Sequence, residues 1–440
     1  MIEMKESNIK WIGKIPTTWN LKKIKYLLGN RTENNNPIKS RDILSLTAKQ
    51  GVIPLAEKEG GGNKPKEDYS AYRLAYPNDI VMNSMNILSG SVGLSKYFGC
   101  VSPVYYMLYT LFKDDDIRFY HYIFQTTVFQ KSLLGLGNGI LIKESDNGKL
   151  NTIRMRIPID KLGNLYIPIT SSEQQKKIAD FLDEKCAEID SISAEIQEQI
   201  NTLEEYKKSV ITEAVTKGLN HNEKMKDSGI EWIGQIPKDW DMKRTKYVSM
   251  SFSKGNGITK EDVDLNGDIQ CIRYGEIYSK YNIMFENCIS ATNLNKISSP
   301  KYISNGDILF AGTGELVEEI GKNIVYIGSK PCLAGGDIII LKHNQNPGFL
   351  NYALCSQYAQ TQKSLGKAKL KVVHISAFDI GNVRIALPPI EEQKKIADYL
   401  DSKCLEIDGA IEDKQKQLEI LDEYKKTLIY EYVTGKKEVV

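Results

Sequence analysis

Two long stretches of the chain carry mostly apolar residues at alternating spacings of four and three, which predicts one helical face turned toward a partner helix. In the first stretch these positions are Leu182, Cys186, Ile189, Ser193, Ile196, Ile200, Leu203, Lys207, Val210 and Ala214. In the second they are Leu400, Cys404, Ile407, Ile411, Lys414, Leu418, Leu421, Lys425, Leu428 and Tyr432. Ser171 or Ser172 can start the first helix, and Pro388-Pro389 delimit the second. We therefore expect two helices of about 45 residues each, packed antiparallel as a coiled coil.

The remaining stretches have shorter patterns, rich in β-branched and aromatic residues and separated by glycine, proline and asparagine turns. Strands are predicted at Ile80–Met82, Val104–Leu108, Ile308–Phe310, Asn323–Ile327 and Ile338–Leu341. Short helices are predicted at Phe119–Leu134 and Phe349–Leu365. These stretches therefore predict globular parts of mixed helix and sheet.

The sequence is also an internal repeat. EQQKKIADFLDEKCAEID from Glu173 returns as EEQKKIADYLDSKCLEID from Glu391, with 14 identities in 18 positions. MKESNIKWIGKIPTTWNLKKIKY from Met4 returns as MKDSGIEWIGQIPKDWDMKRTKY from Met225, with 13 identities in 23. A period of about 220 residues is too long for a solenoid, so it indicates two copies of one domain and its connector.

The helical and repeat patterns together predict an α+β protein with pseudo-two-fold internal symmetry. We expect globular domains at residues 1–170 and 220–389, and helical spacers at 171–219 and 390–440. The repeated segments lie at the edges of each copy, whereas the middles of the two globular parts differ greatly. Similar edges around different middles favour a common frame whose two globular parts read different things.

The overall net charge of +2 hides an alternation that follows the repeat. Residues 1–170 carry a net charge of +8, residues 171–219 −5, residues 220–389 +3 and residues 390–440 −4. Basic surfaces attract phosphates and acidic ones repel them. The globular parts are therefore candidates for nucleic-acid binding, and the helices more suitably face protein or solvent.

Several classes of protein have little support. No apolar run approaches 18 residues, and the polar N-terminus lacks the middle of a secretion signal. The seven cysteines form no Cys-x-x-Cys pair and the four histidines are scattered, so we expect free thiols, a cytoplasmic protein and no metal site. No phosphate-binding Gly-x-x-x-x-Gly-Lys-Ser/Thr loop occurs, and no cofactor is expected.

Three ordered motifs, each present twice, resemble those of the specificity subunits of type I restriction-modification systems. Trp11–Trp19 and Trp232–Trp240 (Trp-Ile-Gly-x-Ile-Pro-x-x-Trp) look like the entry to each target-recognition domain. Glu173–Asp180 and Glu391–Asp398 look like the start of each helical spacer. Asn78-Asp79-Ile80 and Gly306-Asp307-Ile308 resemble the Gly-Asp-Ile element inside each recognition domain, with Asn replacing Gly in the first copy. The resemblance covers essentially the whole chain.

The resemblance implies a non-catalytic subunit in which each recognition domain reads one half of a bipartite site on double-stranded DNA. It also implies that two DNA methyltransferase (modification) subunits and restriction (nuclease-translocase) subunits are partners. Two alternatives remain open. One is a coiled-coil scaffold whose globular parts bind protein or carbohydrate. The other is a self-contained methyltransferase that uses Phe310–Gly314 as its cofactor loop, although the nearest catalytic tetrapeptide, Asn346–Phe349, lacks the second proline.

Candidate DNA contacts are polar, basic and aromatic residues in loops or near their ends, because amides and arginine pair with base edges and lysine mostly meets phosphates. In the first globular part they are Lys64, Lys66, Tyr69, Asn83, Ser84, Asn86, Asn138 and Lys143. In the second they are Arg273, Tyr274, Tyr278, Lys280, Lys367, Lys369 and Lys371.

Two further sets of residues are expected to be structural. The four motif tryptophans, Trp11, Trp19, Trp232 and Trp240, are interpreted as anchors of a domain edge. Lys207 and Lys425 interrupt the helical seam at equivalent positions, and we expect them at its rim beside glutamates.

Overall fold

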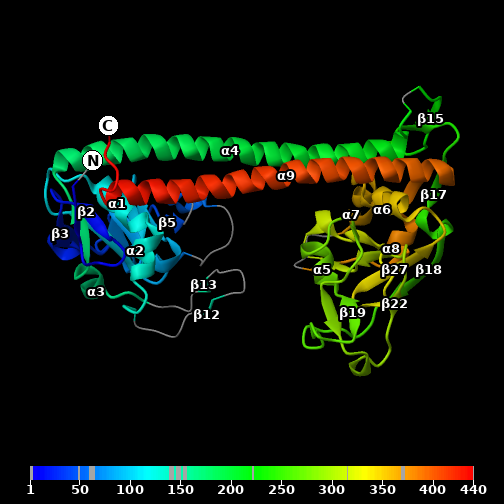
Figure 1. Ribbon diagram of the computed structural model, residues 1–440, viewed down its shortest axis with the longest axis horizontal. Coiled ribbons are helices and arrows are strands. Elements are labelled where there is room, and N and C mark those ends of the chain that lie inside the picture. The colour runs from blue at the N-terminus through cyan, green and yellow to red at the C-terminus, as the bar shows by residue number, and fades with distance from the viewer. Residues whose placement is uncertain are drawn as a thin grey trace. The chain divides into compact units, whose positions relative to one another are not determined.

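The computed structural model describes residues 3–47, 50–58, 65–137, 143–144, 150–151, 156–220, 222–314, 316–367 and 372–439. The chain divides into two compact units. Unit 1 is Met1–Ile196 with Lys416–Val440, and unit 2 is Gln197–Gln415. Each contains helices and sheets in separate layers, so the protein is α+β as predicted (Figure 1).

The core of unit 1 is built on a four-stranded antiparallel sheet in the order β4-β11-β8-β9. Its strands are β4 (Leu28–Arg31), β11 (Tyr105–Thr110), β8 (Ile80–Asn83) and β9 (Val92–Leu94). Successive side chains of β8 enter different cores: Ile80 and Met82 pack with the helices, and Val81 packs on the opposite face. This alternation is what a strand buried on both faces requires.

Smaller strand pairs surround this sheet. They are β1 (Met4–Glu6) with β2 (Lys14–Pro16), β3 (Asn20–Lys23) with β14 (Tyr166–Ile169), β5 (Leu44–Thr47) with β6 (Gly51–Pro54), β7 (Arg73–Ala75) with β10 (Gly99–Val101), and β12 (Lys143–Glu144) with β13 (Leu150–Asn151). β2 and β3 carry the repeated motif, whose Ile12, Ile15 and Trp19 are buried.

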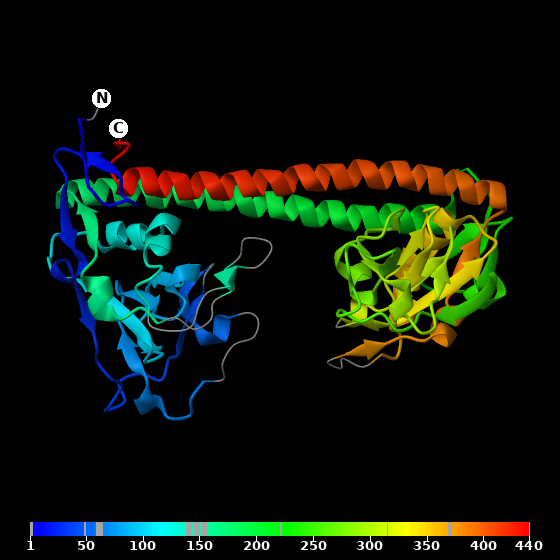
Figure 2. The ribbon, with the colours of Figure 1, turned by 60° about the horizontal axis from the view of Figure 1, so that its bottom comes forward.

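The single helix predicted in the globular part of unit 1 is divided into two helices in the structure. The expected Phe119–Leu134 helix is replaced by α1 (Ile117–Gln125) and α2 (Thr127–Ser132). Thr126 between them has extended backbone angles, and its side chain accepts from the N–H of Phe129. That is the geometry of an N-cap, which ends one helix and starts the next. In Figure 2, α1 and α2 lie between the sheet and the long helices, and the short helix α3 (Ile159–Gly163) leads into β14.

Unit 2 has a five-stranded sheet in the order β18-β27-β23-β25-β20 and a four-stranded sheet in the order β21-β19-β26-β22. The first contains β18 (Ser249–Lys254), β27 (Ile338–His343), β23 (Ile308–Ala311), β25 (Asn323–Tyr326) and β20 (Met284–Phe285). The second contains β21 (Ser290–Thr292), β19 (Ile269–Ile272), β26 (Cys332–Ala334) and β22 (Tyr302–Ile303). Smaller pairs are β15 (Met225–Asp227) with β16 (Gln235–Pro237), β17 (Asp241–Arg244) with β29 (Arg384–Leu387), and β24 (Thr313–Gly314) with β28 (Val373–His374).

The helices of unit 2 repeat the break found in unit 1. The expected Phe349–Leu365 helix is α6 (Pro347–Cys355) followed by α7 (Gln357–Ser364). Ser356 between them caps α7 by accepting from the N–H of Ala359. The short helices α5 (Tyr274–Ser279) and α8 (Ala377–Asn382) complete this unit.

The two units share a topology that their sequences do not reveal. The order β4-β11-β8-β9 in unit 1 corresponds to β18-β27-β23-β25 in unit 2. Along the chain, β11 and β27 are each followed by a pair of helices that a Thr or Ser separates. The duplication therefore extends through the middles of the globular parts, where sequence comparison finds little in common.

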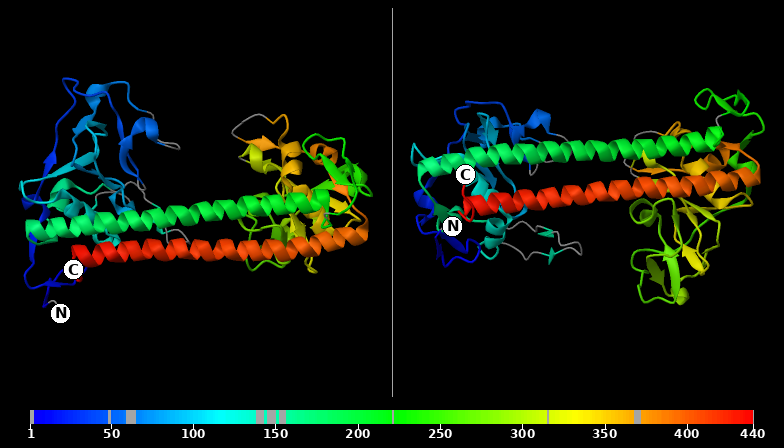
Figure 3. Two further views of the ribbon diagram at one scale, coloured as in Figure 1. Left: turned by 90° about the horizontal axis from the view of Figure 1, so that it is seen from above. Right: turned by 45° about the horizontal axis from the view of Figure 1, so that its top comes forward.

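Both long helices are confirmed. α4 spans Ser172–Lys217 and α9 spans Ile390–Val433. In unit 1, Phe181 stacks on Tyr432 at 4.5 Å, while Asp190 pairs with Lys425. Position rises along α4 as it falls along α9, so the helices are antiparallel; Figures 1 and 3 show them side by side.

Unit 2 has the same antiparallel pairing, through Gln199 with Lys414 and Lys207 with Asp408. The two ion pairs are equivalent: the repeat offset of 218 relates Lys207 to Lys425 and Asp190 to Asp408. The seam lysines are therefore neutralised by aspartates of the facing helix, rather than the glutamates we expected.

The Glu-x-Gln motif fixes each long helix to the globular part that precedes it. Gln175 is fully buried; its side-chain oxygen accepts from the N–H of Asp116, the N-cap of α1, and its amide donates to the carbonyl of Thr170. Gln393 does the same with the N–H of Asn346, the N-cap of α6. Identical hydrogen bonds explain why this glutamine stands in both copies.

The Asn-Asp-Ile and Gly-Asp-Ile elements form the same turn. Asn78 and Gly306 both have positive φ, 68° and 90°, a region that glycine and asparagine tolerate best. The following aspartate closes the turn by accepting from the N–H three residues earlier, at Tyr76 for Asp79 and at Ser304 for Asp307. The replacement of Gly by Asn thus keeps the backbone geometry.

Candidate nucleic-acid interface

Three of the predicted residues of unit 2 line one polar cavity of about 570 Å³. Arg273, Tyr274 and Lys280 come from the start and end of α5, and Lys260 is added from a preceding loop. We call this site the basic cavity. Lys260 and Lys280 are exposed, so their charges are available to an anion in solution.

Arg273 is held in place by the helix that it precedes. Its N–H donates to Glu276 Oε2 at 2.9 Å, and its guanidinium donates to Glu276 Oε1 at 3.1 Å. Glu276 is buried, and it also accepts from the hydroxyl of Ser290. The Arg273 Nε–H is buried without a partner among the described residues. The Arg273 side chain is thus positioned by Glu276 and is 29% exposed, so its outer N–H groups can meet an added acceptor.

The glycine loop 255–257 allows the backbone to approach closely at this site. A Cβ at Gly255 would lie 2.1 Å from the carbonyl oxygen of Gly335, so no other residue fits without displacing backbone. Gly257 and Gly336 also line the cavity. Part of this wall is therefore backbone, next to the side chains of Ile258, Thr259 and Asp337.

Tyr278 does not belong to the basic cavity. Its hydroxyl lies 3.5 Å from the carbonyl oxygen of Glu319, and burial raises its pKa to about 12. Helical periodicity alone would place Tyr278 on the same face as Tyr274, four residues before it, yet only Tyr274 lines the cavity.

The described candidates of unit 1 lie in two stretches of the chain, around Lys66 and after β8. Lys66 is exposed, and Tyr69 is half-buried beside Tyr72. Asn83 accepts from the N–H of Met85 at the end of β8. Asn86 is exposed at the start of the following turn.

Ser84 is a structural residue rather than a DNA contact. It is fully buried, and its hydroxyl donates to the carbonyl oxygen of Val104 at 2.7 Å. The strand pattern ends at Asn83, so sequence alone placed Ser84 in the loop when its side chain still points into the protein.

Four of the candidates lie outside the described residues: Lys64, Asn138, Lys369 and Lys371. Lys143 begins β12, where only its backbone is described.

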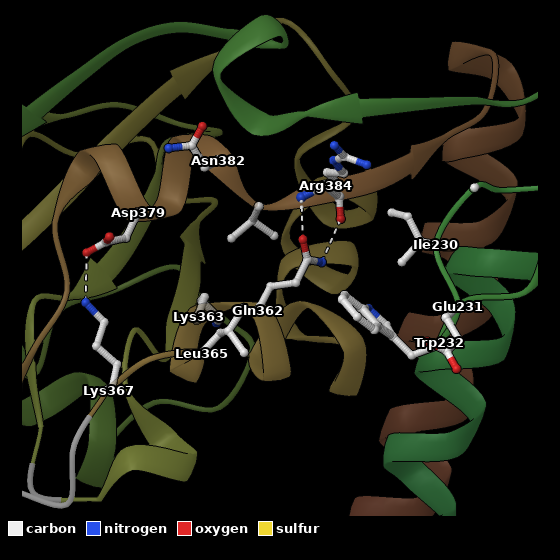
Figure 4. A pocket seen from close by; sticks show the side chains of 12 residues that line it. Ile230, Glu231, Trp232, Gln362, Lys363, Leu365, Lys367, Asp379, Asn382 and Arg384 are labelled. Atoms are coloured by element: carbon white, nitrogen blue, oxygen red, sulfur yellow. Dashed lines mark hydrogen bonds and ion pairs between the residues drawn. The ribbon is translucent and has the colours of Figure 1, made fainter.

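Lys367 lines a second cavity of unit 2, of about 420 Å³, in which Figure 4 shows Trp232, Gln362 and Arg384. Its ammonium pairs with Asp379 at 3.0 Å, which reduces its availability to phosphate. Gln362 holds the last strand through two hydrogen bonds to the Arg384 backbone. Trp232 is 58% exposed here, which is more than we expect of an anchor of a domain edge.

A cavity at the equivalent place in unit 1 contains Trp11 and Tyr166, which the repeat relates to Trp232 and Arg384. Trp11 packs edge-on against Phe129 at 5.3 Å. In unit 2 the position three residues after the helix cap is Ala359. The smaller side chain leaves Trp232 without that aromatic partner. Trp19 and Trp240, by contrast, are buried.

The loop Phe310–Gly314 does not look like a cofactor site. Phe310 is fully buried in β23, and the N–H of Gly312 donates to the carbonyl of Asp337. A Cβ at Gly312 would lie 2.9 Å from that same carbonyl oxygen. The glycines therefore serve the packing of β23 against a neighbouring loop.

Comparison with known proteins finds relatives of one kind. Residues 237–428 match the type I restriction modification DNA specificity domain. The type I restriction enzyme MjaVIII specificity subunit of Methanocaldococcus jannaschii is 28% identical over 63% of this chain and 63% of that subunit. The putative type I restriction enzyme MjaX specificity subunit of the same organism is 25% identical over 99% of this chain and 98% of its own length. The chain is thus similar to type I specificity subunits.

A solved structure from a study of complex assembly in a type I restriction-modification system has the same fold, with a TM-score of 0.69. The likeness covers 96% of this chain and 100% of that one at 14% identity. The part of the chain that matches the domain includes the basic cavity. Among the described residues, no helix is long and apolar enough to cross a membrane, and no cluster of three metal-ligating side chains occurs.

Proposed function

We propose that this chain is the DNA sequence-recognition subunit of a type I restriction-modification complex. The observation that carries the proposal is the basic cavity, which Arg273, Lys260 and Lys280 line together. A partly exposed, positioned arginine suits a base edge or phosphate, and exposed lysines suit the flanking DNA backbone. Relatives named as type I specificity subunits support the same assignment.

In this proposal residues 1–170 and 220–389 are two target-recognition domains, each reading one half of a bipartite site. Residues 171–219 and 390–440 are helical spacers that join them. The shared sheet order with different loop residues supports two readers of one design. The duplicated frame supports docking of two identical methyltransferase subunits, with restriction subunits added to them, in the cytoplasm.

The test is binding of duplex DNA by the complete chain, assembled with its modification subunits, at several salt concentrations. We expect Lys260→Ala and Lys280→Ala each to weaken binding to all sequences. Each should also lower the slope of log K against log salt by about 0.9, because each removes one charge that neutralises a phosphate. Arg273→Ala should instead relax preference at one base pair, by ~1–3 kcal/mol on cognate against mismatched duplex.

Lys403→Ala is the matched control, because this half-buried lysine of α9 is held by Glu406 and lies on an acidic helix. It should leave both affinity and salt slope unchanged. Equal loss from Lys403→Ala and Lys260→Ala would show that the effect is one of general charge. Full retention of affinity in both cavity lysine variants would remove the basic cavity from the DNA interface.

A further inference from the structure

Two thiols of unit 2 are in direct contact. The Sγ atoms of Cys288 and Cys332 lie 2.6 Å apart, although 44 residues separate them in sequence. Cys332 is the fully buried first residue of β26, whereas Cys288 is half-buried in the segment between β20 and β21. All seven cysteines of the chain are free thiols in the structure. The Cys288 sulfur is therefore reachable from solvent, whereas the Cys332 sulfur is buried next to it.

The contact is built by the surrounding residues. The N–H of Cys288 donates to Gln270 Oε1, and Gln270 is the β19 residue that pairs with Cys332 in the parallel ladder. The next N–H, of Ile289, donates to the hydroxyl of Tyr281 at 2.7 Å. Two side-chain acceptors thus fix the backbone on both sides of the Cys288 Cα, which holds its sulfur over Cys332.

We propose that Cys288 and Cys332 are an oxidisable pair that forms a disulfide when a small peroxide is the oxidant. The Cys288 thiolate attacks one peroxide oxygen, the O–O bond breaks, and the departing hydroxide takes a proton to leave as water. Cys288 then carries a sulfenic acid. The Cys332 sulfur attacks the Cys288 sulfur and gives up its proton, the S–O bond breaks, and a second water leaves. Two thiols lose two electrons and two protons to one peroxide, and a dithiol reductant reverses the change.

The order of events follows from exposure. Peroxide must first meet the accessible sulfur, which is that of Cys288. Burial and the contact with Cys288 raise the pKa of the Cys332 thiol, so it remains protonated until the sulfenic acid forms beside it. The new bond would lie close to the basic cavity, because Ser290, two residues beyond Cys288, donates to the Glu276 that holds Arg273.

The experiment treats the purified, reduced full chain with hydrogen peroxide, unfolds it, and counts the thiols that iodoacetamide can alkylate. We expect the number of alkylated thiols to fall from seven to five. Peptide mapping should find Cys288 joined to Cys332, and dithiothreitol should restore all seven thiols.

Cys288→Ser should keep all six of its remaining thiols under the same treatment. Cys355→Ser, a half-buried cysteine on α6, is the matched control and should fall from six to four. Because Cys288 is only half-buried, its replacement by serine is a mild change, and circular dichroism checks folding. Seven thiols remaining in the oxidised wild type would overturn the proposal. So would an equal loss of two thiols in Cys288→Ser, or oxygen addition at Cys288 without a link to Cys332.

Discussion

Lys363 should make the stability of unit 2 depend on pH in an unusual direction. This α7 lysine is 2% exposed, and its ammonium donates to the carbonyl oxygen of Gly321 at 2.8 Å and to Asn323 Oδ1 at 3.1 Å. Both acceptors are neutral, so they compensate only part of the desolvation of the charge. Burial lowers the pKa of Lys363 from 10.5 to about 8.

The sign follows from proton binding. Between the folded pKa of about 8 and the unfolded value of 10.5, the unfolded chain holds the proton and the folded chain does not. Stability therefore rises with pH across this window. At neutral pH the buried charge of Lys363 opposes folding by ~3 kcal/mol, since each pKa unit is worth ~1.4 kcal/mol. Between pH 7 and 9.5 about 2 kcal/mol of that should be recovered.

The assay compares urea unfolding of wild type and Lys363→Met from pH 7 to 9.5. Methionine cannot ionise, so the wild-type free energy of unfolding should gain ~2 kcal/mol on the variant over that range. Other titrating groups, such as buried tyrosines, act in both proteins and cancel in the difference. The constant offset between the proteins, from the two hydrogen bonds that methionine cannot make, does not enter the test.

Lys330→Met provides the control, because Lys330 is exposed on the loop before β26. Its pH profile should run parallel to that of the wild type. Parallel profiles for Lys363→Met as well would refute the reasoning, since they would mean that Lys363 stays charged in the folded protein at no cost.

Two further changes test the helical frame. A double-mutant cycle with Lys207→Met and Asp408→Asn should give a coupling free energy of ~1 kcal/mol in urea unfolding. This value is above that of most surface pairs because the Lys207 side chain is only 14% exposed. Additive effects of the two substitutions would contradict a stabilising ion pair. Ile200→Asp should destabilise by ~3 kcal/mol or more, because Ile200 is 3% exposed and the carboxylate would lack a partner. Ile192→Asp on the same helix, at 46% exposure, should cost under ~1 kcal/mol, and equal losses would refute the assigned seam.

The long helices were predictable because one physical signal runs through them. A seam residue recurs every 3.5 positions on average, and each of the twenty seam positions is buried or half-buried in the structure. The start of each helix was equally readable, since Ser171 and the Pro388-Pro389 pair are strong local signals. Ser171 indeed accepts from the N–H of Gln174.

The helix breaks at Thr126 and Ser356 were missed although their signal is present. Threonine and serine are good N-caps, but within an apolar run they also occur as ordinary helical residues. The choice between these roles is made by packing: Thr126 and Ser356 are buried, and each also donates its hydroxyl to a carbonyl of the preceding helix. These hydrogen bonds are local, but the burial of the two side chains depends on tertiary structure and leaves no periodic trace in the sequence.

The basic cavity was half predictable for a similar reason. Arg273, Tyr274 and Lys280 are close in sequence, so one helix brings them together. Lys260 reaches the site from another loop, which the close approach of Gly255 to Gly335 and the hydrogen bond from the N–H of Asn256 to the carbonyl of Ala334 hold in place. A pairing of this kind, between segments far apart in sequence, is invisible to local patterns.

The cavities beside Trp11 and Trp232 show how duplication and divergence divide the work. The tryptophan, the capped helix and the last strand recur in both units, so the architecture of the place is inherited. One partner position changes from Phe129 to Ala359, and the same tryptophan goes from packed to 58% exposed. Hydrogen bonds of the backbone and of the buried glutamines preserve the shared fold, whereas replacement of a single side chain changes which residues are exposed on its surface. A chain built this way can acquire a new binding surface in one unit without altering the other.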